Sequence, residues 1–190
     1  MEYLEALEAS GFSMWVKESS TAYVAVLAFH TIGLTFLVGI SGTTAMRILG
    51  VAQSMPLAPM EDFFPLMYVG FWINLLTGSV LLCLYPTDYI VDPAIYIKLA
   101  AVVVALVMLN LMKAHVFRRG DPEIQAKTKT AKRFATGLLC AWLVAIVTGR
   151  VIAYSLETRL QTAAAVLVAL LATLFVGYLV GRRLGWIKSS

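Results

Sequence analysis

His30 and Arg150 are the two ionisable residues of this chain whose surroundings make them candidates for chemistry. His30 lies within residues 23–42, a stretch without Asp, Glu, Lys or Arg, and Arg150 interrupts a second apolar stretch, residues 134–156. An ionisable side chain in an apolar segment of this length is costly, and such residues commonly mark functional sites. The question is therefore what these two side chains could bind.

Neutral imidazole is a good ligand for haem iron, and Gly33, one helical turn after His30, would leave room for a flat macrocycle. His30 could equally provide a hydrogen bond at a quinone site. In the alternative interpretation, His30 forms a hydrogen bond with a neighbouring helix and Gly33 lets that helix approach closely. The sequence leaves these interpretations open.

A guanidinium group binds carboxylates through paired hydrogen bonds, so Arg150 is a candidate anchor for a haem propionate or a lipid head group. The spacing predicts Tyr154 and Glu157 on the same helix face as Arg150. In the alternative, Arg150 points outward and pairs with Glu157 or with a carbonyl group of the bundle.

The predicted depths place the two candidates in the same half of a bilayer. His30 lies about 13 Å below the outer end of its segment, and Arg150 lies about 10 Å below Glu157. Lys98 lies about 7 Å below Pro93, so we expect it near the end of its span with its side chain extended to the membrane surface. His115 is expected near the opposite surface, which disfavours a haem held by both histidines. The predicted site therefore comprises His30, Gly33, Arg150 and Tyr154, with His30 as the ligand of a haem iron.

The composition is that of an integral membrane protein. Of the 190 residues, 60% are hydrophobic and only 14% are charged, whereas a soluble domain carries about a quarter charged residues. The mean hydropathy is +0.82. The net charge of +4 does not indicate nucleic acid as a partner, because the basic residues cluster beside apolar segments, where membrane topology explains them.

Five apolar segments approach or exceed the length that a bilayer requires, about 20 residues for a helix. The sequence therefore predicts an all-α, polytopic transmembrane bundle that occupies residues 1–190 as a single domain. The predicted spans are about 21–49, 63–85, 94–115, 134–156 and 160–180. Residues 1–19 are too polar to span, and we expect a short interfacial helix on the outer side, packed across the end of the bundle or against a partner.

The distribution of basic residues predicts the orientation. If the connector 118–133 is cytoplasmic, eleven of the fifteen Lys and Arg residues lie on that side. An excess of Lys and Arg in short loops marks the cytoplasmic side of a membrane. The sequence therefore predicts an N-terminus outside and a C-terminus in the cytoplasm.

Patterns typical of enzymes are missing from the sequence. We find no Walker, Rossmann or zinc-protease motif, and every Asp and Glu lies outside the predicted spans. A relay of carboxylates within the bilayer is therefore unsupported. On its own, the chain is not expected to be an enzyme.

Three short motifs carry a resemblance: Phe29-His-Thr-Ile-Gly33, Met46-Arg-Ile-Leu-Gly50 and Gly149-Arg-Val-Ile-Ala-Tyr154. They resemble a bacterial family of small multi-pass inner-membrane proteins, a domain of unknown function, from the N-terminal helix through the fourth span. Ala45-Met46 stands where that family usually has an acidic residue. The layout is also similar to copper-resistance D-type and b-type cytochrome membrane bundles, in which histidines within helices hold haem or contact metal.

These observations predict a subunit of the bacterial inner (plasma) membrane with a ligand pocket in the outer leaflet, between the first and fourth spans. Haem b is the most concrete ligand and a quinone is another, either of which would connect the protein with electron transfer. The alternative is a non-catalytic subunit that holds a larger complex together. The expected partners are the lipid bilayer and either other membrane or periplasmic subunits or further copies of the chain.

Overall fold

The computed structural model describes residues 1–152, 154 and 156–183, and this part of the chain contains helices and no strands. Its elements are α1 Glu2–Glu8, α2 Gly11–Glu18, α3 Ser20–Ile48, η1 Ala58–Phe63, α4 Phe64–Leu84, α5 Pro86–Val91, α6 Pro93–Phe117, α7 Pro122–Ala126, α8 Lys129–Val151 and α9 Leu156–Arg183. The all-α prediction is confirmed.

Capping residues and prolines explain where the long helices begin. The side chains of Ser19, Asp92 and Thr128 accept hydrogen bonds from backbone N–H groups in the first turns of α3, α6 and α8. These bonds satisfy donors that have no partner within the helix. Proline stands in the first turn of α4 and of α6, where a missing N–H costs nothing.

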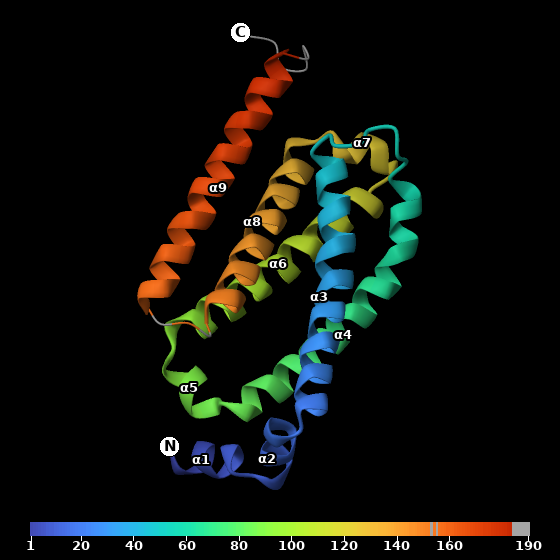
Figure 1. The fold of residues 1–190 in the computed structure, drawn as a ribbon. Helices are drawn as coiled ribbons and strands as arrows, with labels where there is room; N and C mark the ends of the chain where they lie inside the picture. Colours follow the sequence, from blue (N-terminus) through green and yellow to red (C-terminus); the bar gives the residue numbers. More distant parts are fainter. Residues whose placement is uncertain (153, 155, 184–190) are drawn as a thin grey trace.

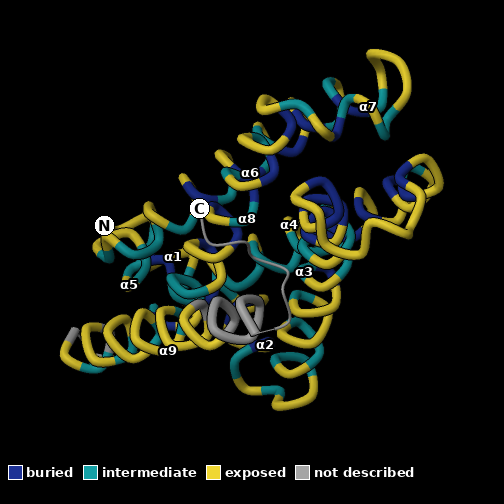
Figure 2. The backbone as a smooth tube through the Cα atoms, turned by 90° about the horizontal axis from the view of Figure 1, so that it is seen from above, coloured by how far each residue is buried: buried dark blue, intermediate teal, exposed yellow. Residues whose placement is uncertain are grey.

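Four helical segments of the described chain are long and apolar enough to cross a membrane. They are α3, η1 with α4, α6 and α8. Only 11% to 33% of the apolar stretch in each is buried within the protein, so most of this surface faces outward (Figure 2). A soluble protein rarely exposes apolar patches of this extent, whereas lipid accommodates them. The fold is therefore compatible with an integral membrane protein.

The four spans form two pairs of sequence neighbours, α3 with α4 and α6 with α8, and the two pairs contact each other chiefly through α3 and α8 (Figure 1). Small residues allow the first pair to pack closely. A Cβ atom added to Gly33 would lie 2.8 Å from the carbonyl oxygen of Gly70, so the two backbones meet at this point. Alanines such as Ala105 and Ala135 are fully buried in the second pair.

Two predictions about individual helices are wrong. The N-terminal segment forms two helices rather than one, because Ser10 accepts a hydrogen bond from the backbone N–H of Ser13 and starts a second helix. The fourth span was predicted over 134–156, but α8 runs from Lys129 to Val151. The polar first turn of α8 belongs to the helix because Thr128 caps it, although hydropathy does not mark it.

The predicted fifth span, 160–180, falls on α9, whose chain direction is opposite to that of α8 in Figure 1. The described apolar part of α9, Leu160–Thr173, is shorter than the four spans above. A total of five spans therefore remains a prediction.

Candidate functional site

A cavity of about 340 Å³ lies between α3, α4, α6 and α8, toward the end of the bundle that carries α1, α2 and α5. His30, Arg150 and Tyr154 line it, so the structure brings together three of the four residues predicted from the sequence. Asn74, Lys98 and Tyr89 also line it, and none of the described residues that line it is acidic.

His30 is half-buried and is held by two polar residues of α4. Its Nδ1 lies 3.0 Å from the hydroxyl oxygen of Thr77. The side-chain amide of Asn74 donates to the backbone carbonyl of His30 over 2.9 Å and lies 3.5 Å from Nε2 of the ring. These bonds hold the imidazole in place against α4.

The hydrogen bonds of Thr77 determine the tautomer of His30. The Thr77 hydroxyl donates to the carbonyl of Ile73 over 2.6 Å, and a hydroxyl has only one proton to donate. Thr77 therefore accepts from His30, so the neutral ring carries its proton on Nδ1 and a lone pair on Nε2. That lone pair can accept a hydrogen bond or bind a metal ion.

Gly33 does not line the cavity. A Cβ atom at Gly33 would lie 2.8 Å from the backbone nitrogen of Asn74 and 2.8 Å from the carbonyl oxygen of Gly70. The space beside Gly33 is therefore filled by α4, and the prediction that it accommodates a ligand is corrected. Gly78 is the small residue next to the imidazole, because a Cβ atom there would lie 3.2 Å from Cε1 of His30.

Lys98 joins the site from α6. A Cβ atom added to Gly149 would lie 3.3 Å from Cε and 3.5 Å from Nζ of Lys98, so the lysine side chain lies against the backbone of α8. From the sequence, Lys98 was expected to lie near the end of its span and to extend its side chain to the membrane surface. Its position adds a primary amine to the lining that contains His30.

Arg150 and Tyr154 lie at the rim of the cavity. Because α8 ends at Val151, Arg150 belongs to its last turn and its side chain is exposed. The predicted helix face shared by Arg150, Tyr154 and Glu157 is therefore wrong, since Tyr154 follows the end of α8 and Glu157 belongs to α9. Arg150 lines the cavity from the end of α8, and Tyr154 lines it from the segment that follows α8.

Tyr89, on the short helix α5, closes one side of the same cavity. Burial raises the pKa of its phenol above the ordinary value, and neighbouring Tyr23, Tyr85 and Asp88 add to the effect. The phenol is therefore neutral near pH 7 and can both donate and accept a hydrogen bond.

No group of three or more His, Cys, Asp or Glu side chains within the described residues is arranged to hold a metal ion. His115 lies at the other end of the bundle, where its Nε2 is 3.0 Å from the hydroxyl of Thr128. His30 is therefore the one histidine available to a ligand in the cavity.

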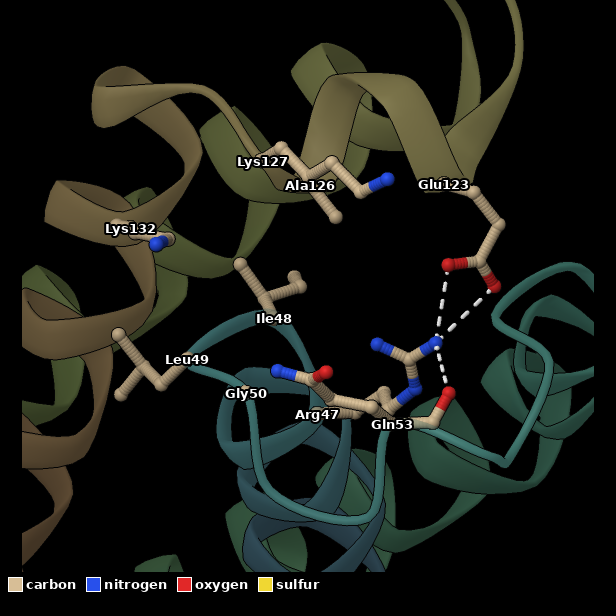
Figure 3. Close-up of a pocket in the computed structure, with 9 residues that line it drawn as sticks. All are labelled: Arg47, Ile48, Leu49, Gly50, Gln53, Glu123, Ala126, Lys127 and Lys132. Carbon is tan, nitrogen blue, oxygen red and sulfur yellow. Dashed lines mark hydrogen bonds and ion pairs between the residues drawn. The ribbon is translucent and has the colours of Figure 1, made fainter. Parts of the chain in front are cut away.

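Sequence reasoning missed a second polar cluster, centred on Arg47, at the opposite end of the bundle (Figure 3). Arg47 is only 9% exposed, and its guanidinium binds the carboxylate of Glu123 at 2.9 Å and the carbonyls of Gln53 and Met55. One signal could have revealed it: Arg47 is the only charged residue between positions 19 and 60.

Comparisons with protein-family models, with characterised proteins and with solved structures gave no match to this chain. The family resemblance stated above therefore remains a prediction that rests on its three motifs.

Proposed function

We propose that this protein is an integral membrane protein whose cavity at His30 binds an amphipathic molecule with an acidic or carbonyl-bearing head group. One observation carries the proposal: His30, Lys98 and Arg150 reach one cavity from three helices, and no carboxylate lines it. The remaining lining is largely aliphatic and aromatic, as is usual for ligand cavities. The volume of about 340 Å³ falls within the range of such sites.

Haem b and quinones are the two candidate ligands with this chemistry. For haem b, Nε2 of His30 would bind the iron, and Lys98 and Arg150 would neutralise the propionates. No second histidine, methionine or cysteine lines the cavity, so these residues fit haem held by one such ligand. For a quinone, Lys98 and the phenol of Tyr89 would donate hydrogen bonds to the carbonyl oxygens. Bound haem would supply one-electron redox chemistry.

The test is the absorption spectrum of the full chain, purified in mild detergent with its native lipids, before and after reduction with dithionite. We expect either a haem Soret band or a quinone recoverable by solvent extraction and mass spectrometry. His30→Ala should lose the ligand, and His115→Ala, at the other end of the bundle, should keep it. Wild-type protein that retains no more of either ligand than His30→Ala contradicts the proposal.

We also propose the orientation and location that the basic residues favour: the bacterial inner membrane, with the N-terminus in the periplasm and the C-terminus in the cytoplasm. The cavity at His30 would then lie in the outer leaflet. A reporter fused after Ser190 tests this orientation. Activity of a periplasm-specific reporter at that position would reverse it.

A second candidate function is that of a structural subunit in a larger complex. Tyr3, Phe12 and Trp15 on the N-terminal helices α1 and α2 are more than half exposed, although these helices are too short to span. Exposed aromatic residues in such a place suit the membrane interface or contact with another subunit. Under this alternative, replacing Phe12 and Trp15 with serine would disrupt the native assembly, whereas His30→Ala would leave it intact.

A further inference from the structure

A second cavity, of about 250 Å³, lies at the opposite end of the bundle from His30. The end of α3, the loop that follows it, α7 and the first turn of α8 form its walls. Three of its lining residues are cationic, namely Arg47, Lys127 and Lys132, whereas Glu123 is the only acidic one.

The guanidinium of Arg47 is fixed before any ligand arrives. Nε donates to the carbonyl of Met55 over 2.6 Å, and Nη2 donates to Gln53 and Glu123. The remaining nitrogen, Nη1, faces the interior of the cavity in Figure 3. A cation whose position is already fixed loses little conformational entropy when it binds an anion.

Glu123 does not neutralise the two lysines. Its carboxylate is engaged by Arg47 and also accepts a hydrogen bond from the backbone N–H of Leu57 over 2.9 Å. Among the residues that the structure describes, neither Lys127 nor Lys132 forms an ion pair with a carboxylate. Both ammonium groups border the cavity in Figure 3, so its lining has a surplus of positive charge.

We propose that this cavity binds a phosphate-type oxyanion, supplied either by a lipid head group or by free phosphate. The cavity lies where the helices α3 and α8 meet the polar connector, and in a bilayer that these helices span it would lie near the level of the phosphate groups. Nη1 of Arg47 can donate hydrogen bonds to phosphate oxygens, and the two lysines add mobile ammonium groups. The site is separate from the cavity at His30 and does not depend on the function proposed for it.

The experiment uses the full chain in an uncharged detergent and measures the affinity for two probes. One probe is inorganic phosphate, titrated against chloride at constant ionic strength and followed by the thermal unfolding temperature. The other is phosphatidylglycerol added to nanodiscs of phosphatidylcholine, with bound lipid counted by native mass spectrometry. If the protein binds phosphate and not the lipid, the ligand of this cavity is a free anion. If it binds the lipid and not phosphate, the ligand is a lipid head group.

The diagnostic variant is Lys127→Gln with Lys132→Gln, which keeps Arg47 and its fold-stabilising bonds. The matched control is Lys129→Gln with Arg133→Gln, which removes the same charge from exposed residues that do not line the cavity. We expect the first variant to bind about tenfold more weakly and the control to bind within about twofold of wild type. Absence of binding to both probes, or equal weakening in both variants, would overturn the proposal.

Discussion

The indole N–H of Trp142 on α8 donates a hydrogen bond to the hydroxyl of Ser41 on α3 over 3.1 Å, and both side chains are buried. Ser41 in turn donates to the carbonyl of Leu37 over 2.6 Å, so both polar groups are satisfied. This is a side-chain hydrogen bond between the two helix pairs, at the contact between α3 and α8.

We expect Trp142→Phe to lower the free energy of unfolding by about 1 kcal/mol, because hydrogen bonds between membrane helices contribute at this level. Ser41→Ala should cost more, because it leaves the indole N–H buried without a partner. The measurement is thermal unfolding in detergent, with Trp72→Phe as the control because Trp72 is 58% exposed. A double variant that destabilises by the sum of the two single variants would exclude coupling between them.

Gly33→Ala should destabilise the protein by about 1–3 kcal/mol, because the added methyl group would push α3 away from α4. Gly39→Ala, in the same helix, is the matched control, since a Cβ atom there meets nothing within 4 Å. That control should be neutral or slightly stabilising, as alanine is a better helix former than glycine. Equal unfolding temperatures for the two variants would show that Gly33 does not set the distance between the helices.

Thr77→Val should remove the constraint on the tautomer of His30, because valine has the shape of threonine without a hydroxyl group. The nitrogen chemical shifts of His30 should report a proton on Nδ1 in the wild type and a mixture of tautomers in the variant. Affinity for the ligand proposed above should fall roughly tenfold, as is typical when the partner of a ligating histidine is lost. Thr35→Val, on the exposed side of α3, should change neither measurement.

Arg47→Ala should lower the free energy of unfolding by about 3 kcal/mol, because it removes the ion-pair partner of Glu123 and the donor to two backbone carbonyls. The loop between α3 and η1 should become sensitive to proteases, since Arg47 holds the carbonyls of Gln53 and Met55. Arg133→Ala at the same end should have little effect, as its side chain is exposed. A loop equally resistant in both variants would show that Arg47 does not organise it.

The contact between α1 and α5 should weaken in acid. Hydrogen bonds from Thr87 and Lys17 lower the pKa of the Glu8 carboxyl below its ordinary value. A carboxyl with a lowered folded-state pKa contributes stability that is fully present above its unfolded-state pKa and is lost as the pH falls through the folded-state pKa. Hydrogen exchange of the α1 amides should therefore accelerate in that window. Glu8→Gln should abolish this pH dependence and Glu5→Gln should retain it.

The presence of each long helix was easier to predict from the sequence than the residues at which it begins and ends. The first three spans agree with α3, α4 and α6 to within a few residues, because prolines and capping side chains coincide with the edges of the apolar segments. The end of α8 was missed because Ile152 and Tyr154 continue the apolar pattern, although neither belongs to the helix. That error also placed Arg150 well inside its helix, whereas it is the penultimate residue of α8.

Depth along each span was enough to predict that His30 and Arg150 lie at a similar level, and both line one cavity. The depth of a residue along its span does not give the rotation of the helix about its axis. This rotation determines that Gly33 faces α4 and that Gly78 faces the imidazole. It also determines that Lys98 reaches α8. The partner of Arg47 was unpredictable for a related reason, since Glu123 is 76 positions away and the fold alone brings them together.

The division of the spans into α3 with α4 and α6 with α8 has a consequence for biogenesis. Each pair consists of spans that follow one another along the chain, so in the membrane location proposed above its packing surface would be complete once the second helix had entered the bilayer. The Gly33–Gly70 crossing can form while α6 is still being synthesised, and the junction of Trp142 with Ser41 forms only after α8 has inserted. Membrane helices that are stable individually associate in such a second step. The cavity at His30, which needs both pairs, is therefore among the last features to be completed.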